Sequence, residues 1–296
     1  MKSTTILSAL VGVSYALVYP RAVENKAAGF TSNDCPVPGA DFWALSKEVA
    51  SNEKRELAER QASGNDTLVT RHEVTIDTWI HVVSSSYKFE DGYVSDEAIL
   101  KQMEVINEAF NKRQFNFRLV GITRTIDADL SVVDADEGID RLGQRLRKGD
   151  FATLNLYVVK DLPGNTAGDC TLPVSAHGGK FLGDGCRFNY DTLPTLSSGR
   201  VLIHEVGHWL GLGHTFQEDS ANPTCTTGHG DDVADTPVHL RPTDNSCTPV
   251  DTCPGLPGQD PINNYMNYTP NSCWTGFTDG QATRMHSMWE VRKKAI

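Results

Sequence analysis

The chain has 296 residues with 38 acidic and 27 basic side chains, so its net charge is −11 at pH 7. Hydrophobic residues make up 39% and charged residues 22%, which excludes a disordered chain and supplies enough apolar side chains for a core. The acidic excess argues against nucleic acid or an anionic membrane as a partner, because such binding needs a stripe of lysine and arginine. The length allows one or two domains.

Residues 1–16 have the features of a secretory signal peptide. Lys2 gives a basic start, residues 6–13 are mostly apolar, and Ser14 and Ala16 are small residues at the −3 and −1 positions of a cleavage site. The apolar stretch is too short to span a membrane, and no other segment has about 18 uninterrupted apolar residues. We therefore predict a secreted, extracellular and soluble product.

The composition changes over residues 17–64, which are rich in Ala, Glu, Lys and Ser and include the dibasic pair Lys54-Arg55. We predict a propeptide that is removed during maturation. The alternative is a helical N-terminal arm of the mature domain. Asn65, in Asn65-Asp66-Thr67, is a glycosylation acceptor, which fits an exposed junction between propeptide and catalytic domain.

Strand and helix patterns alternate after Arg71. Apolar and polar residues alternate at 72–83 and 115–122, and an apolar run follows at 154–159, so three strands are predicted. Amphipathic patterns predict helices at 137–148 and in the segment that Ser95 and Asp96 open, whose apolar face carries Ile99, Met103, Ile106 and Phe110. This order favours a mixed sheet covered by helices.

The second half of the chain is less regular. A loop rich in Gly, Asp and Cys is predicted at 163–198, and a last helix at 279–293. Between residues 215 and 276, Pro, Asn, Asp, Gly and Cys dominate with little periodicity. So long an irregular stretch needs a metal or disulfides to hold it.

The sequence at 204–214 is H-E-x-x-H-x-x-G-x-x-H. On a helix, His204 and His208 lie one turn apart on the same face, where both can bind one metal ion. His214 would lie on the wrong face of that helix, but Gly211 can take the left-handed conformation that turns the chain back. By chance the full motif would occur in roughly 1 in 25,000 chains of this length.

Three histidines and one water form the open tetrahedral site of a catalytic zinc, whereas a structural zinc has four protein ligands. We therefore expect one Zn²⁺ per chain. Glu205 lies beside the histidines without binding the metal, and it suits a general base that takes a proton from the metal-bound water. The motif thus predicts a hydrolytic enzyme.

This motif resembles the zinc signature of the metzincin clan of metalloendopeptidases, which also have a methionine-containing turn beneath the metal. Asn264-Tyr265-Met266-Asn267-Tyr268 provides such a turn. Within the clan, the chain is similar to the pappalysin family, especially its ulilysin-like members and the extracellular metalloproteases that fungi secrete. The resemblance covers about residues 71–292 and extends to His214-Thr215-Phe216, Gly230-Asp231-Asp232-Val233, Asp235-Thr236-Pro237, Phe277-Thr278, Gln281, Arg284 and Met285.

The resemblance implies an α+β metzincin-type fold for a catalytic domain at 65–296. An upper subdomain to about residue 212 would hold a twisted mixed sheet, a backing helix and the active-site helix, and an irregular, disulfide-stapled lower subdomain would follow at 213–296. An edge strand near 164–175 would align the substrate. The implied site comprises the zinc ligands His204, His208 and His214, the base Glu205, the Met-turn residue Met266 and Tyr268.

In related enzymes the tyrosine at the position of Tyr268 hydrogen-bonds the tetrahedral intermediate, and a phenol there would stabilise developing negative charge. A packing role is the alternative. Asn267-Tyr268-Thr269 is formally a glycosylation acceptor, but we expect it to be unmodified because a sugar would obstruct the cleft. Asp231, Asp232 and Asp251 could form a calcium site or be solvated loop residues.

Six of the seven cysteines lie in the predicted catalytic domain, and their spacing alone does not decide their pairing. The resemblance implies the pairs Cys225–Cys253 and Cys247–Cys273 around the Met-turn, which leaves Cys170 with Cys186 across the loop over the cleft.

Cys35 remains, in the propeptide. Its thiolate could bind zinc and keep the enzyme latent, as in related proenzymes, although these have Cys-Gly where this chain has Cys35-Pro36. The alternatives are a bystander thiol, or Asp34 as the blocking carboxylate.

Together these features predict a secreted, monomeric zinc metalloendopeptidase, made as a latent zymogen, that cuts internal bonds of protein or peptide substrates. Two other classes compete with it. The intact Glu205 argues against a binding module that retains metal without catalysis. The third histidine and the Met-turn argue against a zinc exopeptidase or a deacetylase-type hydrolase.

Overall fold

The computed structural model describes residues 38–63, 72–133, 138–164, 166–174, 182–216, 224–225, 230–243 and 245–294. The signal peptide, Cys35 and Asn65 lie outside these residues. No helix within the described residues has both the length and the apolar character that a membrane crossing requires.

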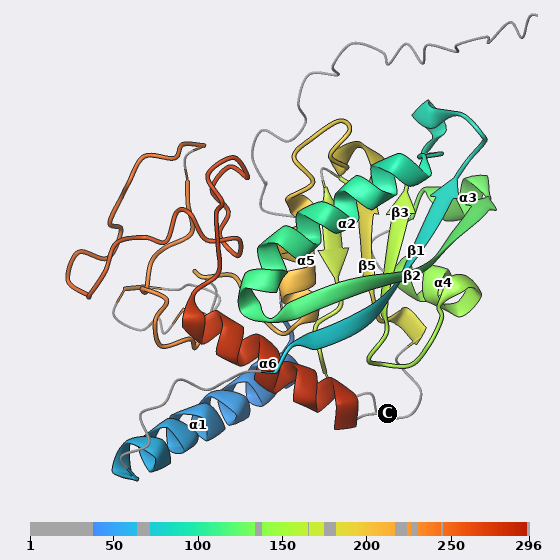
Figure 1. The fold of residues 1–296 in the computed structure, drawn as a ribbon. Coiled ribbons are helices and arrows are strands. Elements are labelled where there is room, and N and C mark those ends of the chain that lie inside the picture. Colours follow the sequence, from blue (N-terminus) through green and yellow to red (C-terminus); the bar gives the residue numbers. More distant parts are fainter. Residues whose placement is uncertain are drawn as a thin grey trace, which may run out of the picture.

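Five strands form one mixed sheet in the order β2-β1-β3-β5-β4 (Figure 1). The strands are β1 (Val74–Ser84), β2 (Phe115–Ile126), β3 (Leu154–Val159), β4 (Gly168–Cys170) and β5 (Cys186–Asn189). β4 runs antiparallel to β5, and the other neighbouring pairs are parallel. The three strands predicted from the sequence pattern are present. β4 lies at the edge of the sheet, within the range 164–175 where the family resemblance implied an edge strand, whereas β5 lies in the segment predicted to be a loop.

The strands expose alternate residues to the two faces of the sheet, as the period of two requires. Ile80 and Leu156 belong to the main core, which also contains residues of α2 (Asp96–Phe110) and α5 (Val201–Trp209). Val83 and Tyr157 belong to a second cluster with residues near α3 (Ala128–Ser131) and in α4 (Gly138–Leu146). The sheet is therefore the middle layer of three.

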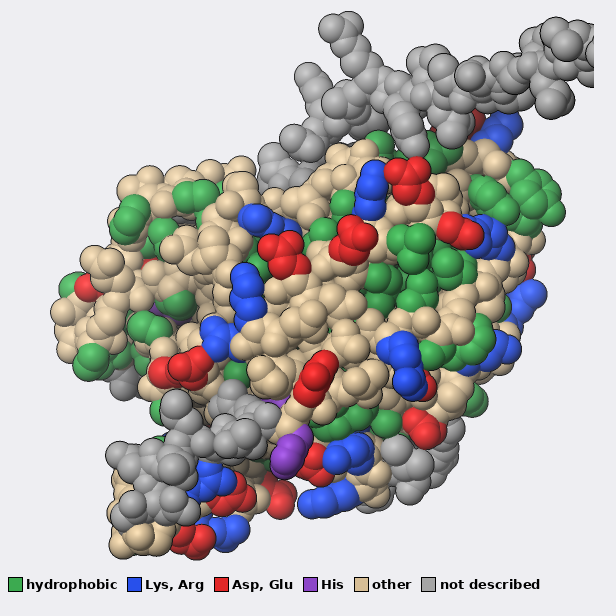
Figure 2. Space-filling view, in the orientation of Figure 1, with side chains coloured by type: hydrophobic (Ala, Val, Ile, Leu, Met, Phe, Trp, Pro, Cys, Tyr) green, Lys and Arg blue, Asp and Glu red, His purple; other side chains and the backbone are tan. Residues whose placement is uncertain are grey.

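Helix α2 forms where the sequence predicts it. The Ser95 side chain accepts a hydrogen bond from the Ala98 N–H, which satisfies one of the free donors at the start of the helix. Its predicted apolar face is buried, and it covers the sheet as the backing helix. On the face of the molecule that carries α2, basic and acidic side chains are interspersed (Figure 2).

The described residues between 210 and 278 form no helix or strand, in agreement with the composition of this segment. Two disulfides join parts of it, Cys225–Cys253 and Cys247–Cys273. The third disulfide, Cys170–Cys186, joins directly opposed residues of β4 and β5, so it cross-links two neighbouring strands at the ends of the segment that connects them. The last helix, α6 (Asp279–Lys294), follows.

The predicted propeptide contains a helix, α1 (Ala40–Ala62), which crosses α6 at one end of the molecule (Figure 1). Phe42, Trp43 and Val49 form a buried cluster with Met288 of α6. The buried Arg284 of α6 donates hydrogen bonds to Glu53 and Ser46 of α1. An apolar contact and a buried ion pair therefore hold α1 against the end of the chain.

Candidate metal centre

Helix α5 carries the first part of the zinc motif and is buried along its whole length. Its end is a Schellman turn: the Gly211 N–H donates to the His208 carbonyl and the Leu212 N–H to the Gly207 carbonyl. Gly211 has a φ of 86°, the left-handed conformation expected for it. The turn reverses the chain so that His214 returns to the face of His204 and His208.

The three imidazoles converge on one point. Their ligand atoms lie within 4.8 Å of one another, and the Nε2 atom of His208 is 3.1 Å from those of His204 and His214. The Nδ1–H of His204 donates to the Tyr265 carbonyl at 2.6 Å, and that of His208 donates to the Leu212 carbonyl at 2.8 Å.

These bonds leave the Nε2 lone pairs of His204 and His208 facing each other. Two lone pairs at this distance repel unless a cation lies between them, so the donor set fits a zinc ion. Burial lowers the pKa of both imidazoles, to about 4 for His208, which keeps them in the neutral form that binds metal. Tyr265 and Leu212, whose backbone carbonyls orient the rings, are not identifiable from the motif alone.

Glu205 is fully buried next to β4, as expected of a residue on the sheet side of α5. A Cβ atom at Gly168 of β4 would lie 3.0 Å from the Glu205 Cγ. Gly168 thus leaves room for the carboxylate side chain beside the histidines. This role of Gly168 was not predicted, because the two residues are far apart in the chain.

Met266 is fully buried and lies against α5, the helix that carries His204 and His208. A Cβ atom at Gly207 of α5 would overlap the Met266 sulfur, which explains a glycine in the middle of the helix. Asn264 accepts a hydrogen bond from the Met266 N–H and donates to the buried Gln281 of α6. This amide pair connects the turn to α6 and was not predicted.

Tyr268 packs against the third histidine, with ring centroids 4.4 Å apart. Phe216 also stacks on His214 at 5.2 Å, with the two rings almost parallel. Trp274 stacks on His204 at 5.4 Å. The aromatic residues come from the irregular part of the chain and shield the histidines from solvent.

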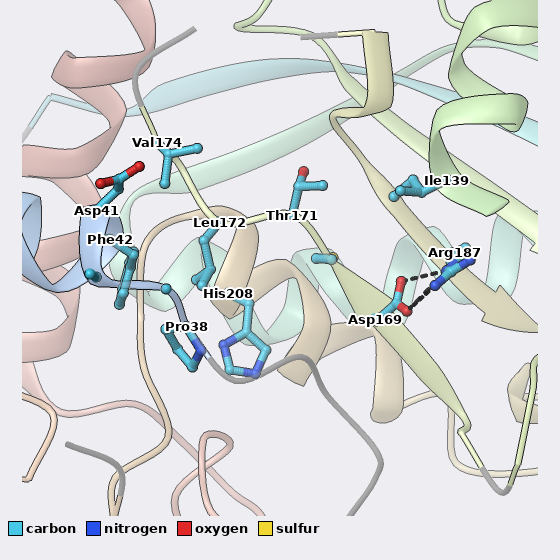
Figure 3. A pocket seen from close by; sticks show the side chains of 13 residues that line it. Pro38, Asp41, Phe42, Ile139, Asp169, Thr171, Leu172, Val174, Arg187 and His208 are labelled. Atoms are coloured by element: carbon cyan, nitrogen blue, oxygen red, sulfur yellow. Dashed lines mark hydrogen bonds and ion pairs between the residues drawn. The ribbon is translucent and has the colours of Figure 1, made fainter. Parts of the chain in front are cut away.

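A pocket beside the triad is lined by the start of α1, by β4 and by His208. Figure 3 shows Pro38 next to the His208 imidazole, with Leu172 and Phe42 nearby. At the other end of the pocket, Arg187 of β5 forms a buried ion pair with Asp169 of β4 at 2.7 Å. Pro38 and the start of α1 therefore line a pocket that reaches one of the three histidines.

The acidic residues considered for calcium do not gather. Among the described residues, the histidine triad is the only group of three or more side chains arranged to hold a metal ion. Asp231 is buried and accepts a hydrogen bond from the Val233 N–H, and burial raises its pKa to about 7. The Asn267 amide is also buried and donates to the Pro261 carbonyl, so it is inaccessible to a glycan in this fold.

The mixed sheet, the helix carrying two histidines and the buried methionine turn define a metalloendopeptidase of the metzincin type. The sequence profile of the pregnancy-associated plasma protein-A family of peptidases matches residues 153–290. An extracellular metalloprotease of Colletotrichum graminicola is 38% identical over 295 residues, which is 96% of both chains. An extracellular metalloprotease of Pyricularia oryzae is 40% identical over 79% of this chain and 81% of its own.

Mature mirolysin of Tannerella forsythia, solved in complex with a cleaved peptide, has a similar fold, with a TM-score of 0.60 and 24% identity over 75% of this chain and 96% of mirolysin. The chain belongs to the pregnancy-associated plasma protein-A family, the pappalysins. Family membership confirms the predicted metallopeptidase class and implies a zinc cofactor.

Proposed function

We propose that this protein is a secreted zinc endopeptidase in which His204, His208 and His214 hold the metal and Glu205 is the general base. The convergence of the Nε2 atoms, described above, is the observation that carries the proposal. A bound zinc would supply a Lewis acid and lower the pKa of a water molecule towards about 7.

Glu205 would take the proton from the attacking water and return it to the amine of the departing fragment. Its side chain lies between α5 and Gly168 of β4, where the close packing restricts its movement. β4 is the last strand of the sheet, so a substrate that adds beside it in an extended conformation would place a peptide bond next to this carboxylate.

Tyr268 would donate its phenol proton to the oxygen that becomes negatively charged during the attack. Its packing against His214 supports this role, because the ring is held beside a metal ligand. The change Tyr268→Phe keeps the packing and removes only the hydroxyl. It should lower kcat by about 10²–10³-fold with little change in KM, whereas a packing role predicts no change.

Mapping of internal cuts in a protein substrate tests the proposal. The change Glu205→Gln should abolish turnover while zinc stays bound, as measured by metal analysis of the purified variant. The change Glu97→Gln, at an exposed position of α2, is the matched control and should leave activity intact. Cleavage by the Glu205 variant would remove this residue from the role of base, and zinc-loaded wild type that makes no internal cut would refute the endopeptidase.

We also propose that the protein is made as a latent zymogen. Pro38 lines the same pocket as His208, and Cys35 precedes it by three residues, a span of at most about 11 Å. A thiolate at Cys35 could therefore reach the metal. Full-length protein with Cys35→Ser should be active before processing. If Asp34 is the blocking carboxylate instead, the change Asp34→Asn and not Cys35→Ser should make the full-length protein active. Latency that survives both changes would exclude the two residues.

Secretion is proposed from the signal peptide at 1–16 and from the relatives named extracellular metalloproteases. N-terminal sequencing of material from the culture medium should find a start near residue 65, after removal of the propeptide. A glycan on Asn65 would be detected in the same sample by mass spectrometry if the cut falls before it. Retention of the protein inside the cell would contradict the proposal.

A further inference from the structure

Two aromatic rings, Tyr268 and Phe216, form a layer beside the metal site. Tyr268 and Phe216 contact each other at 4.9 Å between ring centroids, and both contact His214. Arg241 lies on this layer: its Cζ atom is 4.7 Å from the centroid of the Tyr268 ring and 5.7 Å from that of Phe216. A single ring therefore separates the guanidinium from the third histidine.

The backbone that carries Arg241 is held on its N-terminal side. The buried His239 ring hydrogen-bonds the Thr215 hydroxyl at 2.8 Å, one residue after the third histidine. The Leu240 N–H donates to the Thr252 hydroxyl, which in turn donates to the carboxylate of Asp260. These bonds fix the segment against the loop that follows the zinc motif, so the position of Arg241 relative to the metal site is determined by the fold.

Arg241 differs from the other arginines with restricted exposure near the site. Arg187, Arg284 and Arg292 each form an ion pair with a carboxylate of the chain. For Arg241, which is half-buried, the described residues provide aromatic contacts but no ion pair or hydrogen bond. Stacking on aromatic faces leaves the five N–H donors available in the guanidinium plane, in the geometry that suits a carboxylate.

We propose that Arg241 binds a carboxylate of the peptide substrate close to the scissile bond and makes the enzyme prefer acidic substrates. This inference rests on the endopeptidase activity proposed above. The carboxylate comes from an Asp or Glu side chain or from the C-terminus of a short peptide. A bidentate bond to a planar guanidinium is strong and directional, and the low exposure of Tyr268 and Phe216 limits competition by water.

Peptide pairs test the inference. One set has amidated C-termini and a single Glu, Gln or Lys at each of the three positions on either side of the cut. A second set lacks acidic side chains and ends three residues after the cut in a free acid or an amide. At one position, wild-type enzyme should cut the carboxylate peptide about tenfold faster in kcat/KM than its neutral partner, because a charge-assisted hydrogen bond is about twice as strong as a neutral one. The set that responds identifies the source of the carboxylate.

The change Arg241→Gln should reduce the ratio of kcat/KM between the carboxylate and neutral peptides to about 1. The change Arg241→Glu should reverse the preference, so that the Lys peptide is cut faster than the Glu peptide. Arg241→Lys keeps the charge and should retain part of the preference. Arg124→Gln is the matched control, because Arg124 also lies over a tyrosine ring, Tyr93, at 5.5 Å, but on the opposite edge strand β2. Zinc content and melting temperature confirm that each variant is folded.

Unchanged ratios in a folded, zinc-loaded Arg241→Gln enzyme would overturn the inference, and so would a wild-type enzyme that cuts neutral and acidic peptides equally. Wild type that cuts none of the peptides, nor any protein, would refute the proposed function itself.

Discussion

The two regions that meet at the histidine triad are held together in different ways. In the sheet region, apolar residues of the strands, α2 and α5 form one continuous core, and backbone hydrogen bonds form the ladders. In the irregular region at 210–278, side chains such as Asn264 and Thr252 accept hydrogen bonds from backbone N–H groups, and two disulfides cross-link the chain.

The metal site depends on both regions. His204 and His208 are placed by helix α5, while His214, Met266 and Tyr268 are placed by loops whose structure depends on cross-links. The geometry of the site is therefore only as stable as the irregular region. Perturbations of that region should therefore affect activity before they affect the sheet.

Removal of the metal should have the largest effect. Without a cation between the imidazoles, His214 is no longer linked through the metal to His204 and His208 of α5. We therefore expect activity to disappear and the loops at 215–276 to open. Hydrogen exchange measured by mass spectrometry, with and without a chelator, should show faster exchange there and continued protection of β1 and β3. Equal loss of protection in β1 would show that the two regions unfold as one unit.

Disulfide removal comes next. The Cys247–Cys273 bridge spans 26 residues, and its removal by a double change to Ser should lower the free energy of unfolding by about 3–4 kcal/mol. The Cys170–Cys186 bridge joins strands already paired in the sheet, so the corresponding double change should cost less. Urea unfolding of both variants measures the difference. A larger loss for the strand bridge would reverse the comparison.

One added methyl group can disturb the contact between α5 and the turn that carries Met266. Gly207→Ala would place a Cβ atom against the Met266 sulfur, and overpacking of this kind costs about 1–3 kcal/mol. We expect a lower melting temperature and a lower kcat, because the Met-turn must move away from α5. Gly255→Ala, with no atom within 4 Å of the new Cβ, is the control. Normal kcat in the Gly207 variant would show that the turn adapts without cost.

Acid should weaken the sheet region through His81 of β1. Burial lowers its pKa to about 4 in the folded protein, against about 6.5 when unfolded, so the unfolded chain binds the extra proton first. The stability due to neutral His81 is complete above pH 6.5 and is lost as the pH falls to 4, at up to about 1.4 kcal/mol per pH unit.

His81→Gln should therefore show a smaller loss of unfolding free energy between pH 6.5 and 4 than wild type, in denaturant titrations at each pH. The two charged residues that directly follow α4, Arg147 and Lys148, also lower the pKa of this histidine. An identical pH slope in the variant would assign the acid sensitivity to other buried histidines.

The sequence predicted what depends on local patterns. The cap at Ser95, the apolar face of α2 and the run at 154–159 are visible within a few residues, and the structure contains each of these elements. The metal motif is also local, since its spacing alone places the two helical histidines on one face.

Features formed by contacts between distant residues were missed. β5 was missed, and β4 was expected only from the family resemblance, because strands of three and four residues are too short for a periodic pattern. β4 pairs with β5, and β5 pairs in turn with β3. Gly168 beside Glu205, and Arg241 over Tyr268, are juxtapositions of segments that nothing in their own sequence connects. The layer of aromatic rings beneath Arg241 therefore could not be predicted from the sequence.

The ion pair between Glu53 of α1 and Arg284 of α6 joins residues 231 positions apart. During synthesis, α1 leaves the ribosome among the first segments and α6 among the last. Until translation is almost complete, α1 therefore lacks the helix against which Phe42 and Trp43 pack, and these side chains remain exposed. Every shortened product that ends before α6 lacks the surface on which α1 docks, and would expose these two aromatic side chains to chaperones and to degradation.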